Sequence, residues 1–148
     1  MANKYGKYIM KEPHAAWTSV DPQPKTPAVT SIRVNAKMFE TIGCDFAFVG
    51  VTQPSDPAKG GHPSHTHDVD EYLFLLGGNP RNILDFGAEV ELTLGAGKDK
   101  EVHTITSTSV VYIPKGLAHL PIVFKKLDKP ILFGHLLMAP DYSEKRDR

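Results

Sequence analysis

Twelve prolines and twelve glycines divide the 148-residue chain into short apolar segments, and this spacing constrains the fold more than any other feature. Proline removes a backbone donor and glycine weakens regular structure, so their recurrence keeps the elements between them short. No long stretch repeats its apolar residues with the helical period of about 3.6, whereas several segments alternate or are continuously apolar over the length of a strand. The sequence therefore predicts an all-β barrel or sandwich with little helix.

The predicted strands are bounded by turn-forming residues. Residues 79–82 and 127–130 fit turns, and the glycine-bearing segment 95–100 fits the tip of a hairpin. Phe46 and Phe48 should share one face of their strand, as should Glu71, Leu73 and Leu75. The segments with strand character are 28–34, 45–52, 72–76, 89–94, 101–106, 110–113, 119–125 and 131–138.

The chain divides into three parts around one domain, since its length allows only one domain of ordinary size. Residues 1–27 are expected to form an irregular N-terminal arm, because four prolines exclude regular helix there and Trp17 offers an apolar contact. Residues 28–140 should form the barrel, and residues 141–148 a solvated C-terminal tail. Residues 53–64 should be a loop that leads to His65.

Charge and cysteine content limit the partners. The 17 basic and 17 acidic residues cancel, and no basic run stands out, so we expect neither nucleic acid nor a membrane as a partner. Cys44 is the only cysteine, which excludes an internal disulfide framework and fits a reducing compartment. No apolar run reaches the length of about 18 residues that a membrane span requires. We therefore expect a cytoplasmic protein that binds a small molecule.

Three potential metal ligands lie close together in the sequence, at His65, His67 and Glu71, and His119 is a fourth. Histidines two residues apart project to the same side of a strand, and a glutamate four residues later can join them from the next turn or strand. Imidazole and carboxylate ligands suit Fe, Mn, Ni, Cu or Zn, whereas Ca and Mg prefer shells of oxygen. By itself, a His-x-His pair in a polar loop is also compatible with no metal at all.

The wider context resembles the two sequence motifs of the cupin superfamily. The first motif is glycine, five residues, His-x-His, three or four residues, glutamate, six residues and glycine; residues 65–78 are similar to it, and Gly78 closes it. The opening glycine, expected at Lys59, is displaced to Gly60 or Gly61. The second motif is similar to residues 114–119, Pro-Lys-Gly-Leu-Ala-His, although Thr108 replaces its first glycine and Val123 its final asparagine.

This resemblance covers residues 60–123 and implies a single-domain cupin, a double-stranded β-helix or jelly-roll barrel. The absence of an internal repeat excludes a two-domain bicupin. The resemblance implies one divalent transition metal per chain, held by His65, His67, Glu71 and His119, with Fe or Mn favoured over Zn, Ni or Cu. It also implies a homodimer, which the N-terminal arm or an early strand would hold together.

Other residues have simpler interpretations beside a functional one. Glu89 and Glu91 share a strand face that is most simply solvent-facing, and His135 is more simply a hydrogen-bonded core histidine than a fifth ligand. His62 and His103 have no evident role. Arg33, Tyr72 and Tyr112 could reach a substrate, and the sequence does not rank them.

The function predicted from these residues is a mononuclear metal-dependent enzyme that acts on a small chelating molecule. We favour a dioxygenase over an isomerase, decarboxylase or lyase, because an open metal site can hold oxygen beside a chelating substrate. If Val123 points inward as His119 does, the substrate should have a hydrophobic body. The alternatives are a non-catalytic module that binds or senses a small molecule or a metal, and a purely structural metal site.

Overall fold

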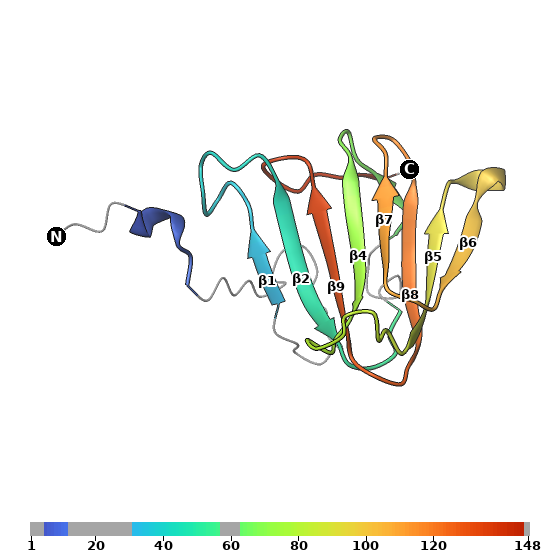
Figure 1. Ribbon diagram of the computed structural model, residues 1–148. Coiled ribbons are helices and arrows are strands. Elements are labelled where there is room, and N and C mark those ends of the chain that lie inside the picture. Colours follow the sequence, from blue (N-terminus) through green and yellow to red (C-terminus); the bar gives the residue numbers. More distant parts are fainter. Residues whose placement is uncertain (1–4, 12–30, 57–62, 147–148) are drawn as a thin grey trace.

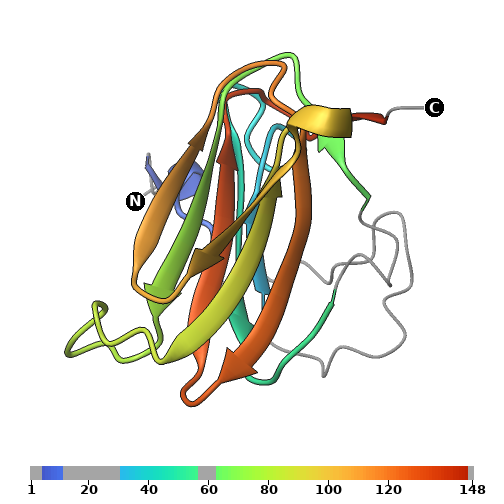
Figure 2. The same cartoon turned by 90° about the vertical axis from the view of Figure 1, so that its right-hand side faces the viewer.

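The computed structural model describes residues 5–11, 31–56 and 63–146. Two five-stranded antiparallel sheets face each other (Figures 1 and 2). The first has the strand order β1-β2-β9-β4-β7 and the second β10-β3-β8-β5-β6. The strands are β1 (Ser31–Val34), β2 (Asp45–Val51), β3 (His65–Thr66), β4 (Glu71–Gly77), β5 (Ala88–Leu94), β6 (Glu101–Ile105), β7 (Ser109–Ile113), β8 (His119–Leu127), β9 (Ile131–Leu137) and β10 (Lys145–Arg146).

The predicted all-β fold is confirmed, and each predicted strand is present to within two residues over its described part. Helical structure is limited to two 3-10 turns among the described residues, η1 (Gly6–Tyr8) and η3 (Gly97–Asp99), and the second forms the tip of the predicted β5–β6 hairpin. The sequence did not predict the two-residue strands β3 and β10. Most of the N-terminal arm, with Trp17, as well as His62, Gly60 and Gly61, lies outside the described residues. No helix in the described part is long and apolar enough to cross a membrane.

The core lies between the two sheets. Alternate residues of β4 point inward, so Glu71 lies on the same face as Leu73 and Leu75, as predicted. Leu75 and Val90 are completely buried, and Leu92 of β5 is 1% exposed. Burial of such side chains drives the packing of the two sheets and provides a rigid support for the site.

The outer faces of the two sheets differ in chemistry. Phe46 and Phe48 alternate with buried Asp45 and Ala47, so both point away from the core. The strand registers place only apolar or aromatic residues and two glycines on this outer face: Ile32, Val34, Phe46, Phe48, Gly50, Tyr72, Phe74, Leu76, Val110, Tyr112, Leu132, Gly134 and Leu136. The second sheet carries charges on its outer face, where Lys125 Nζ lies 3.5 Å from Glu91 Oε2. The outer face of the first sheet is therefore suited to contact with another apolar surface, and that of the second sheet to contact with water.

A bulge in β8 changes which residues point inward. His119 lies opposite Leu94, but Ile122 lies opposite Leu92, so three steps along β8 match two along β5. Ile122 and Phe124 consequently join the core, and Val123 points outward between them. The expectation that Val123 lines the inner wall with His119 is wrong, because it assumed an unbroken alternation along β8.

Candidate metal centre

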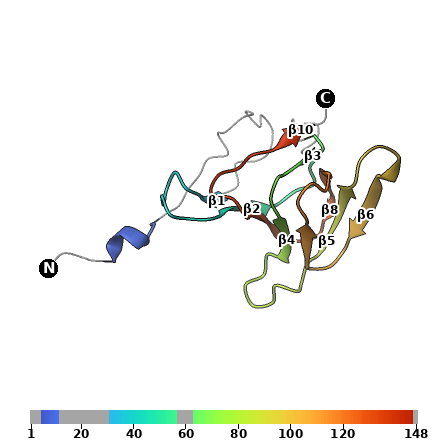
Figure 3. The ribbon, with the colours of Figure 1, turned by 90° about the horizontal axis from the view of Figure 1, so that it is seen from above.

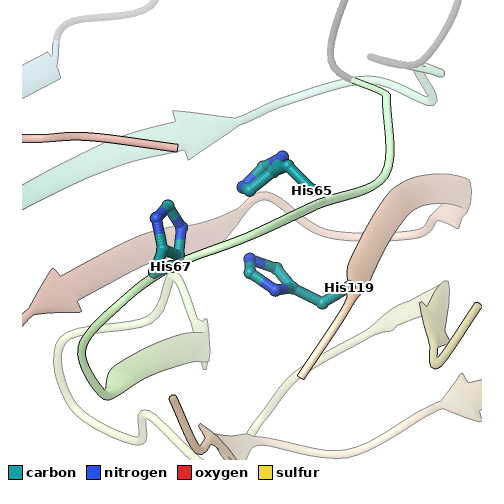
Figure 4. Close-up of side chains that lie close together, drawn as sticks. All are labelled: His65, His67 and His119. Carbon is teal, nitrogen blue, oxygen red and sulfur yellow. The ribbon is translucent and has the colours of Figure 1, made fainter. Parts of the chain in front are cut away.

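Three histidines converge inside one end of the barrel. His65 of β3 lies directly opposite His119 of β8 in the strand register, and His67 follows β3 immediately. All three are buried, and their potential ligand atoms lie within 4.8 Å of one another. Figure 4 shows the three rings pointing toward a common centre. Pairing of β3 with β8 thus unites residues that are 54 positions apart in the sequence.

Backbone carbonyls orient all three rings. His65 Nδ1 lies 3.0 Å from the Pro63 carbonyl, His119 Nδ1 lies 3.1 Å from the Leu117 carbonyl, and His67 Nδ1 contacts the Ser143 carbonyl. A carbonyl oxygen only accepts hydrogen bonds, so each Nδ1 must carry the hydrogen. In the neutral form of each ring, Nε2 then carries a lone pair. In many metal sites a hydrogen bond at one ring nitrogen fixes the tautomer in this way and leaves the other nitrogen available to bind the metal.

Glu71 adds a carboxylate to this group of nitrogen atoms. Its Oε2 lies 2.9 Å from His119 Nε2 and 3.5 Å from His67 Nε2. Within the part of the chain that the structure describes, His67 Nε2 and Glu71 Oε2 are buried and have no hydrogen-bond partner. Such lone pairs repel one another unless a cation lies between them, so the arrangement calls for a proton or a metal ion.

The pKa shifts express the same need for positive charge. Burial raises the pKa of Glu71, but the adjacent imidazoles of His119 and His67 outweigh burial when they are protonated and lower this pKa to about 2. Burial lowers the pKa of His67, but the carboxylate of Glu71 and the Ser143 carbonyl outweigh burial and raise it. Three imidazoles and one carboxylate fit a divalent transition metal better than calcium or magnesium.

Hydrogen bonds connect the loop of the second motif, at residues 114–118, to the loop of the first motif, at residues 67–70. Gly116 has φ +82°, a left-handed conformation that suits glycine, and its N–H donates to the His67 carbonyl at 2.9 Å. The Lys115 N–H donates to Asp70 Oδ1 at 2.9 Å. Gly78, the closing glycine of the first motif, packs so tightly on the Pro130 carbonyl that a Cβ atom would lie 2.5 Å from this oxygen. These contacts fix the positions of His67 and Glu71 relative to His119.

The segment expected to be a solvated tail takes part in the site. Lys145 and Arg146 of β10 pair with Thr66 and His65 of β3, and Figure 3 shows the two strands side by side. The hydroxyl of Tyr142 lies 3.3 Å from His65 Nε2 and donates to Glu144 Oε2 at 2.8 Å. Lys145 and Arg146 do remain exposed, but the segment from Tyr142 to Arg146 packs onto β3. Its polar sequence carries no motif, so sequence reasoning missed it.

A second buried polar cluster lies between β1, β2 and β9. Asp45 is completely buried, and its Oδ2 accepts from Arg33 Nη2 at 2.8 Å and from Asn35 Nδ2 at 3.0 Å. His135 Nε2 lies 3.2 Å from Asp45 Oδ1. His135 is therefore a hydrogen-bonded core residue, and Arg33 is engaged by Asp45. The ring of Tyr142 connects this cluster to the three histidines, since its centre lies 5.9 Å from that of His135.

The remaining candidate residues lie away from the site. Tyr72 and Tyr112 stack on the outer face of the first sheet, with ring centres 5.3 Å apart. His103 is half-exposed and contacts Glu101 at 3.2 Å. Glu91 is paired with Lys125 on the outer face of the second sheet. Each of these side chains therefore lies in a surface environment and contacts none of the three histidines.

The comparisons with known proteins identify the fold. No protein-family model and no curated protein matches the sequence. Oxalate decarboxylase from Bacillus subtilis, described with Mn(II) centers, has a TM-score of 0.56 at 14% identity over 82% of this chain. Oxalate oxidase in complex with the substrate analogue glycolate has a TM-score of 0.57 at 11% identity over 94% of it. Oxalate decarboxylase from Lactobacillus farciminis, in a formate complex, has a TM-score of 0.54 at 15% identity over 82% of it.

The matches cover 28%, 63% and 32% of those three chains, so this chain is similar to a part of each protein. At these identities the similarity shows the architecture alone. It agrees with the fold that the two sequence motifs implied, and the three histidines lie at the positions of those motifs. The protein therefore has the cupin fold, with a three-histidine metal site inside its barrel.

Proposed function

We propose that this protein is a mononuclear metal-dependent enzyme in which His65, His67, Glu71 and His119 hold one divalent transition metal. The observation that carries the proposal is the convergence of the Nε2 atoms of His67 and His119 on a buried carboxylate oxygen of Glu71, where His67 Nε2 and Glu71 Oε2 have no hydrogen-bond partner among the described residues. Such an arrangement is costly in the absence of a cation and favourable around one. Iron or manganese suits the mixture of nitrogen and oxygen ligands.

The substrate class that we propose is a small organic acid able to chelate the metal. The similar structures are described with oxalate, glycolate or formate in their names, which supports this class. A bound divalent metal would supply Lewis acidity and a binding position for such an acid. The chain itself contributes rigid histidine orientation through three backbone carbonyls and a buried environment that limits water.

We favour an oxygen-dependent reaction of the dioxygenase type, and decarboxylation is the second candidate because two of the similar structures are decarboxylases. Two measurements separate these reactions. An oxygen electrode should record uptake of O₂ when the metal-loaded protein turns over an acid by oxygenation. Release of CO₂ without net O₂ uptake would instead identify decarboxylation. We propose that the reaction takes place in the cytoplasm, which the single cysteine supports.

The test begins with metal content. Protein purified without a histidine tag should contain about one iron or manganese per chain, measured by elemental analysis. His65→Ala and His119→Ala should lose the stoichiometric metal and keep the β circular dichroism, because the barrel core does not include the metal. His103→Ala is the matched control on the surface, and His135→Ala should keep most of the metal. Full metal content in the His65→Ala/His119→Ala double variant would contradict the site.

Nitric oxide provides a test of open coordination positions. Anaerobic protein loaded with Fe(II) should bind this O₂ surrogate and give an Fe(II)-nitrosyl signal in electron paramagnetic resonance. Loss of the signal in fully loaded protein would favour a non-catalytic binding or structural site. Binding of small acids without turnover, over a broad panel, would favour a sensor.

A further inference from the structure

We propose that Tyr142 is a fifth protein ligand, which the C-terminal segment delivers to the metal centre. This inference rests on the metal site proposed above. Tyr142 is not in either sequence motif, and it lies 23 positions beyond His119. Its hydroxyl nevertheless lies 3.3 Å from His65 Nε2, the atom through which His65 would bind the metal.

The hydrogen-bond pattern leaves the phenol oxygen facing the site as an acceptor. The single hydroxyl hydrogen of Tyr142 points to Glu144 Oε2 at 2.8 Å, the shorter of its two contacts and the one to a carboxylate. The hydrogen of His65 lies on Nδ1, which contacts the Pro63 carbonyl. Tyr142 Oη and His65 Nε2 therefore direct lone pairs at each other, as Glu71 and His119 do on the other side of the cluster. A cation bound to His65 Nε2 would also accept the lone pair of Tyr142 Oη.

Packing holds Tyr142 in this position. Its ring centre lies 5.3 Å from that of His67, and the Arg33 guanidinium carbon lies 5.5 Å from the same ring centre. On the C-terminal side, Lys145 pairs with Thr66 in the sheet. Contacts on both sides of the residue fix the phenol beside the histidines, which is the arrangement expected of a built ligand and not of a mobile tail.

Coordination requires one proton transfer. The O–H bond of Tyr142 breaks, its oxygen bonds to the metal, and the proton moves along the existing hydrogen bond to Glu144 Oε2. Arg33, above the ring, would help to offset the negative charge of the bound phenolate.

The test uses full-length protein loaded with Fe(II) under anaerobic conditions, oxidised with ferricyanide and desalted. A phenolate bound to Fe(III) absorbs visible light by charge transfer and gives phenolate modes in resonance Raman spectra. We expect both in the wild type, and their complete loss in Tyr142→Phe at unchanged iron content. Tyr112→Phe, at a half-exposed tyrosine on the outer face, is the control and should keep the full band.

Different results would contradict the Tyr142 ligand and the four-residue metal site. Wild-type protein with one Fe(III) per chain and no charge-transfer band would overturn the Tyr142 ligand and leave the four-residue site intact. A band that persists in Tyr142→Phe would overturn the assignment to Tyr142. Protein that takes up no iron or manganese would overturn the proposed function, and the fifth ligand with it. The wild-type spectrum shows whether a phenolate binds the metal even if Tyr142→Phe folds poorly.

Discussion

Replacement of Asp45 by asparagine should destabilise the protein in a way that depends on pH. Asp45 is completely buried and connects Arg33, Asn35 and His135. Burial raises its pKa, but the hydrogen bonds from His135, Arg33 and Asn35 outweigh burial and lower the pKa from the ordinary 3.8 to about 2. Asparagine keeps the shape of the side chain and removes its charge, so the variant isolates the contribution of the carboxylate.

The magnitude follows from linkage between protonation and folding. A fall from 3.8 to about 2, at about 1.36 kcal/mol for each pH unit, corresponds to roughly 2.4 kcal/mol. Since the folded-state pKa lies below the unfolded-state value, this stabilisation is fully present above pH 4 and is lost as the pH falls toward 2. Asp45→Asn should therefore lower the free energy of unfolding by about 2 to 4 kcal/mol at pH 7, including the cost of an unpaired Arg33.

Urea unfolding at pH 7, 5, 4 and 3, followed by circular dichroism in the presence of a chelator, measures this difference. The gap between wild type and variant should be constant from pH 7 to 5 and narrow below pH 4. Asp128→Asn is the control, because Asp128 pairs with Lys126 on the surface and is 61% exposed there, and it should have little effect at any pH. A gap at pH 7 that is absent, or that does not narrow in acid, would refute the reasoning.

Three further predictions use other parts of the molecule. Leu75→Ala, at a completely buried position of β4, should lower the free energy of unfolding by about 2 to 5 kcal/mol in urea titrations, and a smaller loss would mean that the core collapses around the cavity. Glu71→Gln should weaken metal binding without abolishing it, since the amide keeps an oxygen donor but loses the charge. Isothermal titration with Mn(II) measures the affinity, and an unchanged affinity would exclude Glu71 as a ligand. We also propose a homodimer that buries the outer face of the first sheet, because this face is apolar and carries no charged side chain in the strand registers. Sedimentation should show a dimer for the wild type and a monomer for Val110→Lys or after deletion of residues 1–27. The control Val102→Lys, at an equally exposed valine of β6, should remain a dimer. A monomeric wild type would contradict the proposal.

Local sequence was sufficient for much of the fold. Strand positions follow from alternation and from turn residues, which act over a few positions, and the observed strands match them closely. The choice of candidate ligands also came from spacing, since His65, His67 and Glu71 lie within seven consecutive residues. Gly116 entered the sequence analysis as part of the second motif, and the structure gives the local reason for glycine there, a left-handed backbone conformation.

Only the tertiary structure decided what surrounds those residues. Asp45 and His135 are 90 positions apart, and Tyr142 and His65 are 77 apart, so no local pattern couples them. Their proximity depends on which strands pair and in which register, which is a property of the whole packed barrel. The bulge in β8 had the same origin: it reverses the orientation of Val123 relative to His119, because the strand must match β5 while directing Ile122 and Phe124 into the core.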